Sequence, residues 1–395
     1  MKQEKLLILN GSFSELTLIQ KAKEMGFYVV TTGNMPALIG HSYADEYIPA
    51  DYSDKEQILS LVKENRITKI VSNANDFGVL TAAYVAEQMG WEGHDTYEHA
   101  VLLHHKDKFK AYCIEKGIPS PKSEIFTDKG AAFTYAKNCC YPIIVKANDL
   151  TGGKGISRAV NFSEAEAAIE NAFQKSRDKC IVMEPFLTGR QQSFGGFISG
   201  GKIIASYSND CISVVNPYLI QAETLPAEQI ETIRPELERI MQEIVSDLNL
   251  CDGIFCLQYM VCDGRPYIIE MMRRCFGNQF LTLASANTGF PWEEAYLLAQ
   301  TGQDTSGITC GEPERKYCGH YGIMISQNGI FKRYTIAPEF EKHIFMKIDM
   351  LKPGEAIEDC MNQRVAYVYY AYDSGSEMRA ASRHFHEMVH VELEQ

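Results

Sequence analysis

A lysine at the end of an apolar run, followed at once by a glycine-rich loop, is the first feature that could carry out chemistry. The run (YPIIVKA) is rich in β-branched side chains, which predicts a buried strand with Lys146 at its exit. The loop contains three glycines and a second lysine: Gly152, Gly153, Lys154 and Gly155. Glycines let backbone N–H groups close around an anion, so the pattern indicates a phosphate-binding loop. A plain glycine hairpin fits it as well, and the spacing is not that of a P-loop.

Polar residues follow two apolar runs near the N-terminus. The first run is followed by Gly11 and Ser12, and a later one by Asn75 and Asp76. Ligands of parallel sheets meet the carboxyl ends of the strands, so these four residues are candidates for substrate binding. Helix capping and turn formation are the competing explanation, because Ser, Asn and Asp are preferred in those roles.

The elements that must position these residues can be predicted from periodicity. Strands and helices alternate over the first hundred residues, which predicts a parallel sheet. After about residue 310, short segments broken by Gly and Pro predict a small mostly-β domain. We therefore predict three domains, at residues 1–104, 105–310 (with a lid at about 125–190) and 311–395.

Composition narrows the classes of function. The 395 residues are 45% hydrophobic, as in an ordinary globular protein, and the net charge of -13 argues against a nucleic-acid partner. No apolar window approaches the length of a membrane helix. The twelve cysteines include no Cys-x-x-Cys pair, so we expect reduced cysteines in a cytoplasmic protein.

Four motifs, in this order and spacing, resemble the ATP-grasp superfamily. They are Asp107-Lys108 with Gly117-Ile118-Pro119; Val145-Lys146 with the glycine loop; residues 183–187 (MEPFL) with Gly189; and residues 269–274 (IEMMRR). The layout is similar to that of biotin carboxylase and of the ATPase subunit of phosphoribosylaminoimidazole carboxylase. The resemblance implies an α/β fold, α+β in part, with an N-terminal parallel-sheet domain and a small C-terminal domain.

The resemblance also implies a role for each motif. ATP would lie between two antiparallel sheets, with its phosphates contacted by Lys108 and Lys146 and covered by the glycine loop. Glu184, Phe186 and Leu187 would frame the adenine, and Gln191 would stand near the ribose, where the family usually has a glutamate. These expectations come from the family and not from composition.

The implied chemistry is ATP-dependent joining of a carboxylate to an amine through an acyl phosphate. Arg274 would hold the anionic reaction centre, and the adjacent Arg273 is a second candidate for anion binding. The substrates would be a small carboxylate and an amine, which the sequence does not identify, and the resemblance is compatible with a homodimer.

The metal site is where the sequence departs from the family pattern. The family holds Mg²⁺ with two acids and an asparagine, and the matching positions here are Gln258, Glu270 and Met272. An amide oxygen is a weaker ligand for Mg²⁺ than a carboxylate, and a thioether is a poor one. An alternative function is therefore nucleotide binding with weakened or lost catalysis.

A third hypothesis comes from the C-terminus. His386, Glu387 and His390 match His-Glu-x-x-His, the zinc-peptidase motif, which predicts a zinc hydrolase if the three residues share one helix. A solvated C-terminal segment is the simpler explanation, because only five residues remain to supply a third ligand.

Overall fold

The chain begins with a parallel four-stranded sheet. In the computed structural model, which describes residues 3–150 and 153–394, its strands lie in the order β3-β2-β1-β4. The strands are β1 (Lys5–Leu9), β2 (Tyr28–Gly33), β3 (Glu46–Pro49) and β4 (Lys69–Ser72). The helices are η1 (Phe13–Glu15), α1 (Leu16–Glu24), η2 (Ile39–Tyr43), α2 (Lys55–Glu64), α3 (Asp76–Met89) and α4 (Tyr97–His104). Leu9 pairs with Ser72, so the loops after β1 and β4 meet at one edge.

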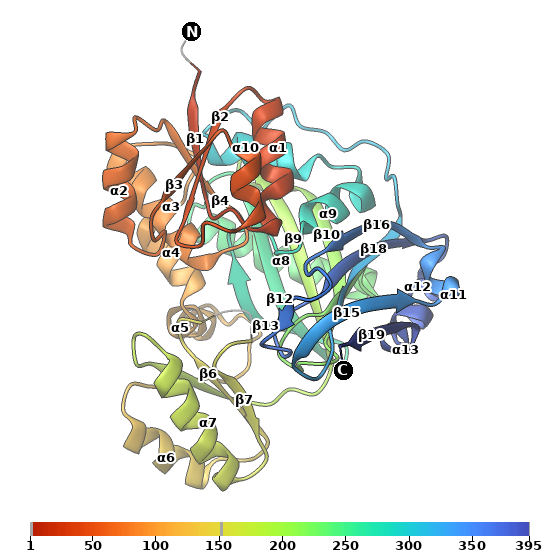
Figure 1. The fold of residues 1–395 in the computed structure, drawn as a ribbon. Coiled ribbons are helices and arrows are strands. Elements are labelled where there is room, and N and C mark those ends of the chain that lie inside the picture. Colours follow the sequence, from red (N-terminus) through yellow and green to blue (C-terminus); the bar gives the residue numbers. More distant parts are fainter. Residues whose placement is uncertain (1–2, 151–152, 395) are drawn as a thin grey trace.

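A second, antiparallel sheet forms the lid, in the order β5-β8-β6-β7. Its elements are β5 (Glu124–Phe126), α6 (Lys129–Asn138), β6 (Ile143–Ala147), β7 (Ile156–Ala159), α7 (Phe162–Lys175) and β8 (Ile181–Pro185), reached through α5 (Lys106–Lys116). Figure 1 shows α6 and α7 together on the outer side of this sheet. Val145 packs beneath these helices, so the alternation of β6 turns Ile144 and Lys146 to the opposite face.

The central sheet has eight antiparallel strands, in the order β13-β12-β9-β10-β11-β14-β18-β16. They are β9 (Arg190–Ser199), β10 (Lys202–Ile212), β11 (Ala222–Leu225), β12 (Gly253–Cys262), β13 (Arg265–Met272), β14 (Tyr317–Ile323), β16 (Ile344–Asp349) and β18 (Ala366–Tyr372). The helices of this region are α8 (Ile230–Asp247), α9 (Phe280–Thr288) and α10 (Trp292–Gln300). Asp263 and Gly264 both have positive φ, at 51° and 74°, as the turn between β12 and β13 requires.

The C-terminal region continues this sheet instead of standing apart from it. Strand β14 pairs with β11, and β18 pairs with β14. The remaining elements are β15 (Gly329–Ile336), α11 (Pro338–Glu341), β17 (Ala356–Ile357), α12 (Gly375–Ser382), α13 (Phe385–Met388) and β19 (Val389–Leu393). The predicted α/β class with an antiparallel α+β part is confirmed. None of the described helices is long and apolar enough to cross a membrane.

Candidate active site

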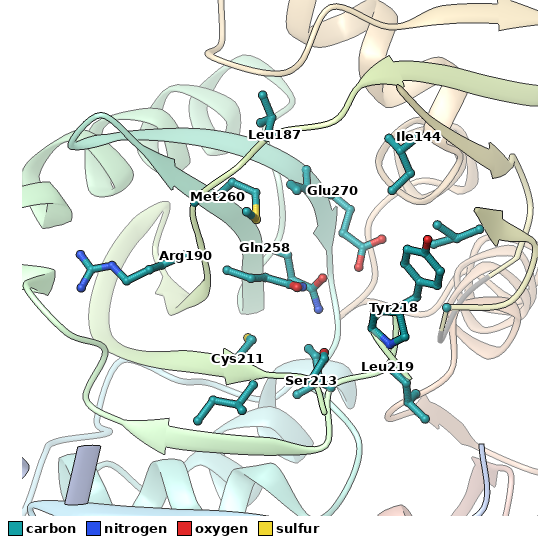
Figure 2. Close-up of a pocket in the computed structure, with 18 of the residues that line it drawn as sticks. Ile144, Leu187, Arg190, Cys211, Ser213, Tyr218, Leu219, Gln258, Met260 and Glu270 are labelled. Atoms are coloured by element: carbon teal, nitrogen blue, oxygen red, sulfur yellow. The ribbon is translucent and has the colours of Figure 1, made fainter. Parts of the chain in front are cut away.

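A cavity of about 1070 Å³ lies between the lid sheet and the central sheet. Ile144 borders it from the lid, and Gln258, Met260 and Glu270 border it from β12 and β13 (Figure 2). This volume is slightly above the range of about 300–1,000 Å³ that small-molecule sites usually occupy.

Three buried charged side chains form the wall of the cavity under the lid. The Glu184 carboxylate lies 2.6 Å from Lys146 Nζ and 3.0 Å from Lys110 Nζ, and it accepts a 2.6 Å hydrogen bond from Ser123 Oγ. Burial would raise the pKa of Glu184, but the two ammonium groups lower it to about 2. Two lysines around one glutamate leave an excess positive charge, which suits a polyphosphate.

The lysines that α5 contributes differ from the predicted one. Lys106 and Lys110 line the cavity, whereas Lys108 is exposed and lies outside the cavity lining. A helix turns about 100° per residue, so residues 106 and 110 share a face and residue 108 points away. Lys106 Nζ donates to the carbonyls of Asn148 and Leu150, at 3.2 and 2.5 Å, and burial lowers its pKa. Lys106 and Lys110 therefore take the place at the cavity that was expected for Lys108.

The described part of the glycine loop borders the cavity through Gly153. Gly152 lies outside the described residues, and Lys154 is exposed and outside the cavity lining. Gly153 borders the cavity with a φ of 76°, and a Cβ there would lie 2.5 Å from the Tyr218 carbonyl oxygen. Gly155 has a φ of 68°, and a Cβ there would lie 2.8 Å from Cβ of Ala147. Both positions therefore require glycine.

The segment after β8 forms an apolar slot. Phe186, Leu187 and Gln191 all border the cavity, as predicted for the adenine and ribose end. The Phe186 backbone N–H donates to the Pro142 carbonyl at 3.0 Å, so this N–H already has a hydrogen-bond partner within the protein. The guanidinium of Arg158, which the motifs did not identify, lies 4.7 Å from the centre of the Phe186 ring.

Gln258 and Glu270 face each other on β12 and β13. They are direct cross-strand partners, and within the described residues neither side chain makes a hydrogen bond to the protein. Met272 is buried in the hydrophobic core, at 2% exposure, and is outside the cavity lining. The hairpin thus presents one carboxylate and one amide side chain to whatever binds in the cavity.

The two adjacent arginines have different environments. Arg274 borders the cavity, and its guanidinium donates to both carboxylate oxygens of Asp76 at 2.7 Å. Burial opposes ionisation of Asp76, but Arg274 outweighs it and lowers the pKa of the carboxyl. Arg273 instead is buried on the other side, where it pairs with Asp95 at 2.6 Å. Arg273 and Asp76, which were expected to contact substrate, thus lie outside the lining of this cavity, whereas Arg274 borders it.

The other N-terminal candidates have local structural roles. Ser12 Oγ accepts from the Ser14 amide and donates to Glu15 at 2.6 Å, forming a helix cap. Asn75 caps α3 through the Gly78 amide at 3.1 Å. A Cβ on Gly11 would overlap the ring of His41. Ser12 and Asn75 are thus helix caps, Gly11 is a close-packed turn position, and Ala74 is a residue of this edge that borders the cavity.

Three residues at the far end of the cavity were missed. Glu223 on β11, Asn278 before α9 and Arg364 before β18 border it. They come from segments up to 141 positions apart (residues 223 and 364), and no local motif identifies them. The pairing of β11 with β14 and of β14 with β18 brings the segments of Glu223 and Arg364 together.

The zinc-peptidase hypothesis is wrong. Helix α13 ends at Met388, so His390 lies on β19 and the motif does not occupy one helix. Over residues 3–150 and 153–394, no group of three His, Cys, Asp or Glu side chains is arranged to hold a metal ion.

Comparison with known proteins agrees with this geometry. Residues 105–210 match the family model of the ATP-grasp (A) domain of phosphoribosylglycinamide synthetase. The chain also aligns with phosphoribosylglycinamide synthetase from Anaerococcus prevotii, at 16% identity, with 100% of both chains covered and a TM-score of 0.77. For L-amino acid ligase from Bacillus licheniformis the identity is 17%, with 100% of both chains covered and a TM-score of 0.81.

A third similar structure is the biotin carboxylase domain of 2-oxoglutarate carboxylase from Hydrogenobacter thermophilus, in complex with MgADP, ADP and bicarbonate. Its identity is 18%, covering 98% of this chain and 90% of that one, with a TM-score of 0.76. The chain therefore has the ATP-grasp fold, which confirms the resemblance drawn from the four motifs.

Proposed function

We propose that the protein is an ATP-dependent ligase that joins a carboxylate to an amine through an acyl phosphate. The observation that carries the proposal is the cluster of Lys110, Lys146 and Glu184 at the wall of a cavity that Lys106 also borders. Three ammonium groups against one carboxylate give a net positive wall, which favours the phosphates of ATP. The similarity to an L-amino acid ligase and to a domain bound to MgADP supports the same class of reaction.

Each group of cavity residues would bind a different part of the substrates. The slot of Phe186 and Leu187 would bind the base, with Gln191 toward the ribose. Lys106 and Lys146 would balance charge on the phosphates as the terminal phosphoryl group leaves. Arg274 would hold the carboxylate substrate, and its salt bridge with Asp76 fixes the guanidinium in place before substrate arrives.

The residues present fit Mg²⁺, but they offer fewer ligands than the family pattern does. Glu270 and Gln258 offer two oxygen ligands on neighbouring strands, and the nucleotide phosphates would supply others. When bound, the ion would neutralise charge on the phosphates. Because Met272 is buried in the core, a second firmly held ion has no support from this hairpin.

A second candidate function, nucleotide binding with weak or lost catalysis, is favoured by the same hairpin. A hydroxamate assay separates the two candidates: hydroxylamine traps an acyl phosphate formed from ATP and any of the twenty proteinogenic amino acids or small dicarboxylates. Hydroxamate above the protein-free background supports the ligase. ATP binding without any hydroxamate or phosphate release supports the binding protein.

The ATP site itself is tested with Lys146→Ala in isothermal titration with ATP and Mg²⁺. We expect the affinity to fall by roughly ten- to a hundredfold, the scale of losing a charge-assisted contact of about 1.5–3 kcal/mol. Lys129→Ala is the matched control, because Lys129 pairs with Glu170 on the outer side of the lid. Equal affinities in all three folded proteins would contradict the proposed nucleotide site.

A further inference from the structure

Glu223 is a buried carboxylate at the edge of the cavity that has no basic partner of the usual kind. Its side chain is 3% exposed, and its oxygens lie 2.7 Å from Asn209 Nδ2 and 2.6 Å from His320 Nε2. Within the described chain, no lysine or arginine lies within 4.0 Å of it. This differs from Glu184, which has two lysines, and from Asp76, which has Arg274.

The strand register places Glu223 on the face that carries the hairpin pair. Gln258 pairs with Ser193, and Ser193 pairs with Asn209. Cys211, two residues farther along β10, pairs with Glu223. Partners across strands and residues two apart share a face. Gln258 and Glu223 therefore lie on the same side of the central sheet, and both border the cavity.

His320 is placed to hold Glu223 and not to bind a ligand itself. It is fully buried, it pairs with Glu223 across β11 and β14, and it is outside the cavity lining. Its Nδ1 has no hydrogen-bond partner among the described residues. A buried carboxylate is costly unless its charge is compensated, and a neutral amide and one imidazole compensate it only in part. A cation arriving from the cavity would complete the compensation.

We propose that Glu223 binds the ammonium group of the amine substrate and takes its proton, with His320 as a positioning residue. This rests on the proposed ligase function and assigns it an acceptor that arrives positively charged. Glu223 removes one proton from R–NH₃⁺, and the freed electron pair attacks the acyl carbon. The C–N bond forms as the C–O bond to phosphate breaks. Of the two further protons on nitrogen, one stays in the amide and the other leaves with inorganic phosphate as HPO₄²⁻.

Amine binding is measured by calorimetry on protein saturated with MgADP, using methylamine, putrescine, glycine and L-alanine as probes. We expect at least one amine to bind, and Glu223→Gln to weaken it tenfold or more without changing ADP affinity. Glu293→Gln is the matched control: it makes the same change in a carboxylate that accepts hydrogen bonds from Thr282 and Ser285 and lies outside the cavity lining. Its amine affinity should equal that of the wild type.

The role of His320 is tested by conservative rescue. His320→Gln keeps a donor toward Glu223 and should hold amine affinity within about threefold of the wild type, whereas His320→Leu should lose it as Glu223→Gln does. Equal losses in both variants would assign His320 to structure alone.

Each remaining outcome is decisive. Unchanged amine affinity in a folded Glu223→Gln protein overturns the assignment, and so does wild-type protein that binds ADP but none of the amines. A wild type that binds no ADP refutes the proposed function first, and the role of Glu223 with it.

The proton step is tested by comparing two reactions of Glu223→Gln. Hydroxamate formation should be unchanged, because hydroxylamine is largely uncharged at neutral pH, whereas ligation to the best-binding amine should slow by about 10²–10⁴-fold. Equal slowing of both reactions would contradict proton transfer to Glu223.

Discussion

Glu184 and Glu15 are both buried glutamates, one in the lid and one beside the parallel sheet, but their neighbours differ in charge. Glu184 has two ammonium groups within 3.0 Å. The Glu15 carboxylate accepts hydrogen bonds from the Ser12 hydroxyl and amide, at 2.6 and 2.9 Å, and no salt bridge to it is present among the described residues. The pKa of Glu184 is lowered to about 2, whereas burial raises that of Glu15 to about 7.

The difference shows that burial alone does not decide ionisation. Burial disfavours the charged form of both glutamates, and only nearby cations reverse it. The Glu184 carboxylate at the lid wall therefore stays ionised at all physiological pH values. The N-terminal edge instead holds a carboxyl group that exchanges its proton near neutrality. Glu15 has no cation beside it, which agrees with a structural role in the helix cap.

The largest expected effect comes from removing the charge of Glu184. Glu184→Gln leaves Lys110 and Lys146 buried without a carboxylate, and we expect the free energy of unfolding to fall by about 3–5 kcal/mol at pH 7. Because the folded pKa is lowered from 4.5 to about 2, this contribution is present above pH 4.5 and is lost as the pH falls toward 2. Urea denaturation at pH 7 and pH 3 measures both parts.

Glu228→Gln is the control for this change, because the pair of Glu228 with Arg190 is about one-third exposed on both sides. It should cost less than about 1 kcal/mol. Similar losses for the two variants would mean that the lid cluster is no stronger than a surface pair.

Glu15 should show pH dependence of the opposite sign. Its folded pKa is raised from 4.5 to about 7, so its contribution to stability is full below pH 4.5 and is lost as the pH rises to about 7. The total is about 3 kcal/mol, at about 1.4 kcal/mol per pH unit. The Glu15→Gln variant lacks this loss, so unfolding at pH 5 and pH 8 should change the wild type more than the variant. Parallel pH profiles would show that Glu15 stays ionised.

A smaller effect, on binding, separates two lysines of one helix. Lys106→Ala should weaken ATP affinity about tenfold, whereas Lys108→Ala, with the same loss of charge on the outer face of α5, should leave it unchanged. Titration calorimetry with ATP and Mg²⁺ checks both. If the Lys108 variant loses as much as the Lys106 variant, the effect is a long-range one of net charge and not a contact.

Among the residues predicted from the sequence that border the cavity, Lys146 and Glu184 lie near the ends of their strands, whereas Gln258 lies within β12. Lys146 and Glu184 follow from an apolar run and its exit, since the alternation of a strand fixes which side each residue takes. The fold class and the hairpin at residues 263–264 also follow from local patterns. For these features a short window of sequence contains the physical cause.

Where the structure departs from the sequence-based expectation, the position of the side chain depends on helix phase or on distant packing. Lys106 and Lys108 differ only in the direction they face, which depends on how α5 packs against the cavity. Arg273 and Arg274 are likewise adjacent, and only their distant partners Asp95 and Asp76 distinguish them. Glu223 borders the cavity through pairing with β14, almost a hundred residues later, so no window of sequence could reveal it.

The smallest expected effect concerns Gln258, where the hairpin departs from the family pattern. Gln258→Glu is nearly isosteric, so packing should change little. Without an ion, the new carboxylate would repel Glu270, its direct cross-strand partner, and lower the melting temperature slightly. With ATP and Mg²⁺ the sign should reverse, because the cation then lies between two carboxylates.

We therefore expect a larger Mg²⁺-dependent rise in melting temperature for Gln258→Glu than for the wild type, by a few degrees, in the presence of ATP. Gln191→Glu is the matched control, since it adds the same charge to the cavity on β9, which is not the strand paired with Glu270. Its response to Mg²⁺ should stay close to that of the wild type. A Gln258 variant that ignores Mg²⁺ would show that the hairpin pair does not bind the ion. The nucleotide would then have to carry its metal without help from β12, and the contrast between a charged lid and a weakened hairpin would be greater still.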